Sequence, residues 1–327
     1  IAATSLDISG DIDVDGTTET DVLTINGSQF NYKAFGTSSI MIGDTTTGTI
    51  DAANFNTGLG VNVFADLTTG DSNVAIGFGS LTNNTTGGSN VAVGVNSLEA
   101  NTTGSNNTAL GLQALDTNTT ADNNTAVGFQ SLFANTTGAD NVAVGKSALV
   151  ANTTGGSNVA IGKHALDANT TASKNTAIGQ AALTTNTTGA SNTSVGQGSL
   201  QNNTTADSNT AVGTDALNAN TTGAINTAVG YLALAKCTTG SSNVALGYDT
   251  LGELTTVSDN TAVGYAALQA STSGTGLAAF GKGALRANTT GSVNTAVGQN
   301  ALVANTTGET NVAVGATALD ANTSADA

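Results

Sequence analysis

The stretch from residue 141 to residue 157 decides the fold, and it reads Asn-Val-Ala-Val-Gly-Lys-Ser-Ala-Leu-Val-Ala-Asn-Thr-Thr-Gly-Gly-Ser. The same pattern begins again every 17 residues, and its first glycine belongs to a series that runs without a slip from Gly43 to Gly315. A helical hairpin repeat needs about 33 residues and a propeller blade about 40, so this unit is too short for either. The period predicts an all-β fold, a parallel β-solenoid that stacks about seventeen coils along one axis.

Alternation within the unit predicts two short strands in each coil. Val142 and Val144 flank Ala143, which is the period-two pattern of a strand with one buried face. We expect the second strand around Leu149, because a leucine stands at this position in every clear repeat. The Asn-Thr-Thr-Gly stretch forms one corner, and the first glycine forms the other, where a positive φ favours glycine. The corner glycines include Gly77, Gly94, Gly111, Gly128, Gly145 and Gly162.

The small residues of the unit predict contact between chains. We assign Val142, Val144 and Leu149 to the interior of the coil, which places Ala143 and Ala148 on its outer faces. A face in solvent would vary freely, whereas these two positions stay small over most coils. Close packing of another chain explains the restriction, so we expect a homo-oligomer of parallel rods, most simply a homotrimer. The alternative is that alanine merely suits a narrow coil.

The Asn-Val-Ala-Val-Gly and Asn-Thr-Ala-Val-Gly segments resemble the head repeats of trimeric autotransporter adhesins, which form left-handed parallel β-rolls in threes. The longer unit, with its Ala-Leu-x-x-Asn-Thr-Thr-Gly half, is more similar to repeats of phage tail fibres that carry an endosialidase-type intramolecular chaperone. The resemblance covers about residues 56–327 and carries no catalytic residues. One departure is that the coil is longer than the usual adhesin head repeat.

This resemblance implies a non-enzymatic fibre shaft on a virion tail, which supports host attachment. Its partners would be further copies of the chain, other fibre subunits, and a glycan or protein on the host cell surface. The alternative is a bacterial trimeric surface adhesin, or an extracellular filament whose subunits join end to end through their N-terminal strands.

Composition argues against several other functions. Charged residues make up only 9% of the chain, against about a quarter in an ordinary globular domain. The net charge of −16 argues against nucleic acid and anionic membranes as partners. No segment approaches 18 consecutive apolar residues, so we expect no membrane span. The one histidine, His164, has no cysteine or carboxylate pair held beside it by the repeat, so we expect no enzyme.

Residues 1–38 lie outside the repeat and predict a β-stranded connector or neck, followed by the solenoid over residues 39–327. Within the connector, Asp11, Asp13 and Asp15 match the opening of an EF-hand calcium loop. The twelfth position of that loop is Val22, where a bidentate glutamate is required. We therefore expect no cofactor and interpret these acidic residues as the wet face of a strand, with weak calcium binding as the alternative.

The position after the first glycine of each unit predicts the place where a receptor would make contact. Lysine, glutamine and threonine precede three consecutive tyrosines there, so the candidate contact residues are Tyr231, Tyr248, Tyr265 and Lys282. Stacked tyrosines on an outer edge offer aromatic surface to a sugar or a protein. The simpler interpretation is that the tyrosines stack on one another and stabilise the repeat.

The Asn-Thr-Thr triplet is an N-glycosylation motif that recurs in most units, for example at Asn84 and Asn101. Glycans one coil apart would stand about 4.8 Å from each other and collide. We therefore expect these asparagines to form a hydrogen-bonded ladder at a corner of the solenoid. Cys237, the one cysteine, replaces the asparagine in its coil and has no partner for an intrachain disulfide.

Overall fold

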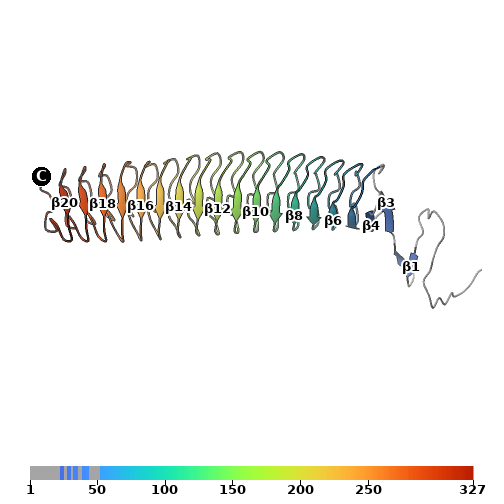
Figure 1. The fold of residues 1–327 in the computed structure, drawn as a ribbon, viewed down its shortest axis with the longest axis horizontal. Coiled ribbons are helices and arrows are strands. Elements are labelled where there is room, and N and C mark those ends of the chain that lie inside the picture. Colours follow the sequence, from blue (N-terminus) through green and yellow to red (C-terminus); the bar gives the residue numbers. More distant parts are fainter. Residues whose placement is uncertain (1–22, 26–27, 31, 36–38, 44–51, 327) are drawn as a thin grey trace, which may run out of the picture.

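The computed structural model describes residues 23–25, 28–30, 32–35, 39–43 and 52–326, which fold mainly into one long β-solenoid (Figure 1). Short strands lie side by side along the long axis, and after each strand the chain returns through an irregular loop to start the next coil. This arrangement confirms the predicted all-β parallel solenoid with 17-residue coils. At about 4.8 Å per coil, the strands from β5 to β20 extend over roughly 75 Å.

The strands at the N-terminal end differ from those of the regular coils. These five are β1 (Leu23–Ile25), β2 (Ser28–Phe30), β3 (Tyr32–Phe35), β4 (Ser39–Gly43) and β5 (Thr57–Gly60). β1 and β2 pair in antiparallel fashion with each other, and β3 pairs in antiparallel fashion with β4. From β4 onward every pairing is parallel, so β4 begins the parallel stack, and the regular three-residue strands follow from β6.

Each regular coil then contributes one strand of three residues. Their bounds are β6 Val74–Ile76, β7 Val91–Val93, β8 Thr108–Leu110, β9 Thr125–Val127, β10 Val142–Val144, β11 Val159–Ile161, β12 Thr176–Ile178, β13 Thr193–Val195, β14 Thr210–Val212, β15 Thr227–Val229, β16 Val244–Leu246, β17 Thr261–Val263, β18 Ala278–Phe280, β19 Thr295–Val297 and β20 Val312–Val314. Each strand residue pairs with the residue 17 positions later in the next strand, as Ala143 does with Ala160. Like residues therefore form straight columns along the rod, and we name each column after its residue in the coil 141–157.

The prediction of a second strand around Leu149 is wrong, because the structure has a turn there. Leu149 has a φ of 54° and Ser147 a φ of 53°, and the equivalent residues of the other coils share this left-handed conformation. Left-handed residues at alternate positions curl the chain too tightly for an extended strand. The turn still bonds to its neighbours, since the Leu149 N–H donates to the Ala165 carbonyl at 3.0 Å.

The assignment of faces is also wrong, and it is inverted for the strand. Ala143 and its equivalents are fully buried, whereas Val142 and Val144 lie partly exposed on the outer side. Ala148 is buried together with Leu149, so neither alanine column is available to a second chain. A 17-residue coil encloses a narrow interior, and alanine on one wall leaves just the width that leucine on the other wall fills.

Two columns of buried asparagine complete the interior. In the Asn152 column each side-chain N–H donates to the side-chain oxygen of the coil before it, over 2.9 Å from Asn152 to Asn135. The same amide donates to the Gly155 carbonyl at 2.9 Å, which closes the turn. In the Asn141 column each side-chain oxygen accepts from the backbone N–H of the next coil, over 2.9 Å between Asn158 and Asn141. The predicted asparagine ladder is confirmed, and a second one accompanies it.

Candidate functional site

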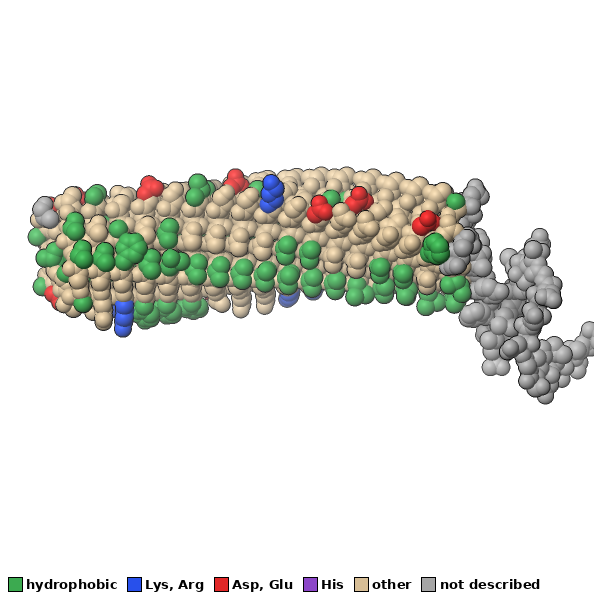
Figure 2. Space-filling view, viewed as in Figure 1, with side chains coloured by type: hydrophobic (Ala, Val, Ile, Leu, Met, Phe, Trp, Pro, Cys, Tyr) green, Lys and Arg blue, Asp and Glu red, His purple; other side chains and the backbone are tan. Residues whose placement is uncertain are grey.

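The candidate interaction surface is the outer side of the strands, formed by the Val142 and Val144 columns and called here the strand face. The Val142 column consists mainly of valine and threonine, whereas the Val144 column is Val, Ile, Leu or Phe in every coil from β5 to β20. Figure 2 shows rows of hydrophobic side chains that extend along the rod. Large apolar side chains held outward over so many coils are unusual for a surface in water.

The strand face remains accessible even though each side chain shields the next. Leu59 is 48% exposed, Leu110 is 47% exposed and Phe280 is 42% exposed. Neighbouring members of a column stand about 4.8 Å apart and cover each other's flanks, so the remaining exposure is the outward tip of each side chain. A continuous apolar strip therefore lies on one side of the solenoid.

The Lys146 column runs beside this strip, one residue beyond the corner glycine, and changes character along the rod. Its N-terminal members are apolar and between 41% and 52% exposed, and these are Val61, Phe78, Val95, Leu112 and Phe129. The column then becomes polar before it becomes aromatic, and its polar members are Lys146, Lys163, Gln180, Gln197 and Thr214. The apolar strip is consequently wider over the first regular coils than over the middle of the rod.

The structure brings the four candidate contact residues together in this column. The Tyr231 and Tyr248 rings stack with centroids 5.5 Å apart, and those of Tyr248 and Tyr265 stack at 5.1 Å with an interplanar angle of 7°. The Lys282 amine lies 5.8 Å from the Tyr265 ring centroid, within the range of a cation–π contact. Stacking covers most of the ring faces, so the surface offered outward consists of ring edges and phenol hydroxyls.

Each corner glycine from Gly77 onward directly follows a strand and begins the turn that comes after it. From Gly60 to Gly315 their φ values lie between 126° and 142°, a region that L side chains rarely adopt. A Cβ on Gly162 would lie 2.5 Å from the carbonyl oxygen of Gly179 in the next coil. The glycine therefore allows both the turn between strand and loop and the close approach of neighbouring coils.

The titratable groups of the described residues form pairs rather than a reactive cluster. The His164 Nδ1 atom lies 3.0 Å from a carboxylate oxygen of Asp167 on the surface. Burial, together with the nearby Glu99 carboxylate, raises the pKa of Asp116 to about 6, and a hydrogen bond from Gln113 opposes the shift. The described part of the chain holds no group of three or more His, Cys, Asp or Glu placed to bind a metal. Asp11, Asp13 and Asp15 lie outside the described residues.

The glycosylation motifs do not offer their asparagines to an enzyme in the folded chain. Asn84, Asn101 and the equivalent asparagines up to Asn220 have no exposed surface. Cys237 is also fully buried, and its thiol donates to the Gly240 carbonyl at 3.5 Å. Burial raises the pKa of this thiol to about 11, so it remains protonated at neutral pH.

Sequence reasoning missed the strand face because it placed the larger residues inside. One signal was present: the Val144 column never accepts a polar residue, although the neighbouring Lys146 column does. Alternation shows that the two sides of a strand differ, but it does not show which side is buried.

Comparison with known proteins adds no family to this picture. No protein-family model matches the chain, and no curated protein matches it. Among the described residues there is no helix of the length and apolarity needed to cross a membrane.

Proposed function

We propose that this chain is the non-enzymatic shaft of a phage tail fibre, and that it works as a homotrimer of parallel rods on the virion. The observation that carries the proposal is the strand face, an apolar strip along a rod whose interior is already complete. Backbone and side-chain bonds between neighbouring coils make such a rod stiff. A stiff rod suits a part that holds a host-binding end away from the particle.

The strand face replaces the alanine columns as the surface through which the copies pack. A strand of three residues is about 10 Å long, so roughly 75 Å of rod presents an area of about 750 Å². A stable protein–protein interface buries about 800 Å² per partner, so the strand face has about the area that one such interface needs. Two such faces meeting side by side would bury most of this strip. The resemblance to trimeric fibre and adhesin repeats favours three copies over two.

Two matched variants of the full chain test the interface. Ile161→Lys with Val212→Lys places two charges on the strand face, three coils apart. Ser157→Lys with Ser208→Lys places the same charges, at the same spacing, in an exposed column where Lys174 already stands. We expect the second variant and the unaltered chain to have three times the 31.7 kDa chain mass by light scattering, and the first to dissociate. A monodisperse monomer for the unaltered chain would overturn the trimer.

The location of the protein distinguishes the fibre from its alternatives. Gold-labelled antibodies against the purified chain should mark the tails of virions. Labelling of bacterial cell surfaces instead would favour the adhesin.

For the end-to-end filament, the purified chain should polymerise, and removal of residues 1–38 should stop it.

The tyrosine column is the proposed contact for a host-surface glycan or protein. Its aromatic edges and hydroxyls, with the Lys282 amine beside them, suit a polar partner better than an apolar one. Replacing Tyr231, Tyr248 and Tyr265 with serine should abolish binding of the purified chain to host cells. Phe78→Ser and Phe129→Ser in the same column are the control. Equal loss of binding by both variants would count against a localised contact.

A further inference from the structure

The buried ladder of the Asn152 column is interrupted over three consecutive coils. It runs from Asn84 to Asn220, and the next three positions are Cys237, Leu254 and Ser271 before asparagine returns at residue 288. At the edges of this gap, the Asn220 side-chain oxygen and the Ser271 hydroxyl are buried without a hydrogen-bond partner. Buried polar groups without partners lower the stability of the structure around them.

The second asparagine ladder is interrupted in the same region. Leu277 stands in the Asn141 column, where its backbone N–H still donates to the Asn260 side-chain oxygen at 3.0 Å. Leucine has no amide with which to pass the ladder on to the following coil. The Asn152 column is thus interrupted from Cys237 to Ser271, and the Asn141 column is interrupted at Leu277, in the coil that follows Ser271.

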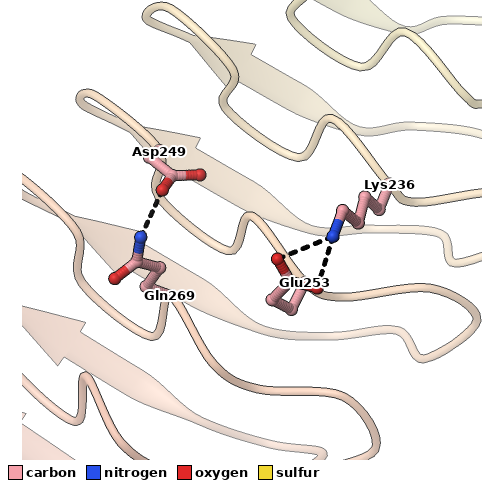
Figure 3. Close-up of polar contacts among 4 residues, drawn as sticks. All are labelled: Lys236, Asp249, Glu253 and Gln269. Atoms are coloured by element: carbon pink, nitrogen blue, oxygen red, sulfur yellow. Dashed lines mark hydrogen bonds and ion pairs between the residues drawn. The ribbon is translucent and has the colours of Figure 1, made fainter.

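The same coils also carry contacts between their outer side chains. The tyrosine stack lies here, and Lys236 bonds to both carboxylate oxygens of Glu253 at 2.8 and 2.6 Å. Gln269 donates to the Asp249 carboxylate in a neighbouring coil (Figure 3). Exposed ion pairs of this kind contribute little and weaken as salt is added. These coils therefore lack the buried amide bonds of the Asn152 column, and the contacts described here lie on their outer surface.

We propose that the coils from Tyr231 to Leu277, called here the seam, form the segment at which the rod opens while the coils on both sides stay folded. In a solenoid each coil contacts only its neighbours, so stability is close to a sum over separate interfaces. Opening then occurs at the lowest cost where consecutive interfaces are weak. The inference does not depend on which proposed function is correct.

Cys237 provides a reporter inside the seam. It is the one cysteine of the chain and has no exposed surface, so a thiol reagent reaches it only when the seam opens. A labelling rate measured with an excess of an aromatic disulfide reagent in native buffer therefore reports the opening equilibrium.

Three forms of the full chain make the test. The first is the unaltered chain. The second carries Leu254→Asn and Ser271→Asn, which restores two positions of the ladder and keeps the reporter. The third carries Ser131→Cys with Cys237→Ser, which moves the one cysteine to a buried position in a coil whose asparagine ladders are both intact.

We expect both variants to be labelled at least tenfold more slowly than the unaltered chain. For the unaltered chain, the labelling rate should rise with urea less steeply than global unfolding predicts, because opening of the seam exposes only part of the surface that the whole chain would expose. Equal rates in all three forms, or a rate that follows global unfolding, would overturn the seam. Hydrogen exchange on the unaltered chain is a check that needs no variant: amides of residues 231–277 should exchange faster than those of residues 141–187, and equal protection would also overturn it.

Discussion

At the scale of the residue, the corner glycine is the position that tolerates least change. Its φ near 130° disfavours any L side chain, and the carbonyl of the next coil occupies the space of a Cβ. Both restrictions act at every regular coil except the last, where a Cβ on Gly315 meets nothing closer than 3.9 Å. The 17-residue period and the corner glycine are therefore linked, because neighbouring coils lie so close together that a side chain does not fit at this position.

Gly162→Ala should lower the free energy of unfolding by about 2–4 kcal/mol, since it adds a clash to an unfavourable φ. Gly276→Ala is the matched control, because Gly276 has a φ of 64° but a Cβ there would lie 3.9 Å from its nearest neighbour, a methyl carbon of Val293. We expect the control to cost only about 1 kcal/mol. Urea denaturation measures both, and similar losses would show that the clash contributes nothing.

Asp116 should make stability depend on pH between about 4 and 6. Its pKa is 3.8 when unfolded and about 6 when folded, mainly because burial disfavours the charge. The folded state then binds the proton more tightly, so this contribution is present below pH 4 and is lost as the pH rises to 6.

Asp116→Asn should remove that part of the pH profile and stabilise the chain at pH 7. Urea midpoints at pH 4, 5, 6 and 7 provide the measurement, and Asp66→Asn, which removes an exposed carboxylate, is the control. If the urea midpoints of Asp116→Asn and of the unaltered chain differ by the same amount at every pH from 4 to 7, the prediction is contradicted.

At the scale of the element, the coil depends on its buried amide as much as on its strand. Three residues of strand make few ladder bonds, and the asparagine side chain joins the turn to itself and to the preceding coil. Buried amides with all partners in place hold a narrow interior together without requiring more apolar volume. This explains how a thin core of alanine and leucine supports a long rod.

Asn152→Ala should therefore cost about 2–4 kcal/mol, because it leaves the Asn135 side-chain oxygen and the Gly155 carbonyl without this donor. Thr154→Ala in the same turn, where the side chain is exposed, should change stability by less than about 0.5 kcal/mol. Chemical denaturation monitored by circular dichroism compares the two. Equal effects would mean that the ladder is a consequence of the fold and not a source of its stability.

At the scale of the whole molecule, the rod is a sum of interchangeable coils. Deleting residues 158–174 removes one complete unit and joins two positions that are already neighbours in the repeat. We expect this variant to keep its circular dichroism spectrum and a thermal midpoint within about 4 °C of the unaltered chain.

Deleting residues 158–173 leaves one residue too many and moves every later column out of register. A shift by one residue turns inward-facing side chains outward, so this variant should be strongly destabilised. If both deletions behave alike, the solenoid does not depend on its exact period.

The sequence by itself determined the period, the parallel stacking, the corner glycines and the hydrogen-bonded ladder of the Asn152 column. These follow from local chemistry: a fixed repeat aligns identical residues, and a glycine or asparagine at a corner has few other uses. The strand around Val142 was also predictable, since three alternating residues suffice to identify it.

Only the tertiary structure decided which side of the strand is buried and what the Leu149 segment becomes. Val142 and Val144 are more apolar than Ala143, so sequence alone places them inside. The width of the interior reverses that order, because a regular coil has room opposite leucine only for a small residue such as alanine. Left-handed residues then fold the leucine segment into a turn, which a pattern of apolar residues does not report. Packing between the two walls of the coil, such as Ala143 against Leu149, determines both the buried side of the strand and the turn. A local pattern of apolar residues does not describe this packing.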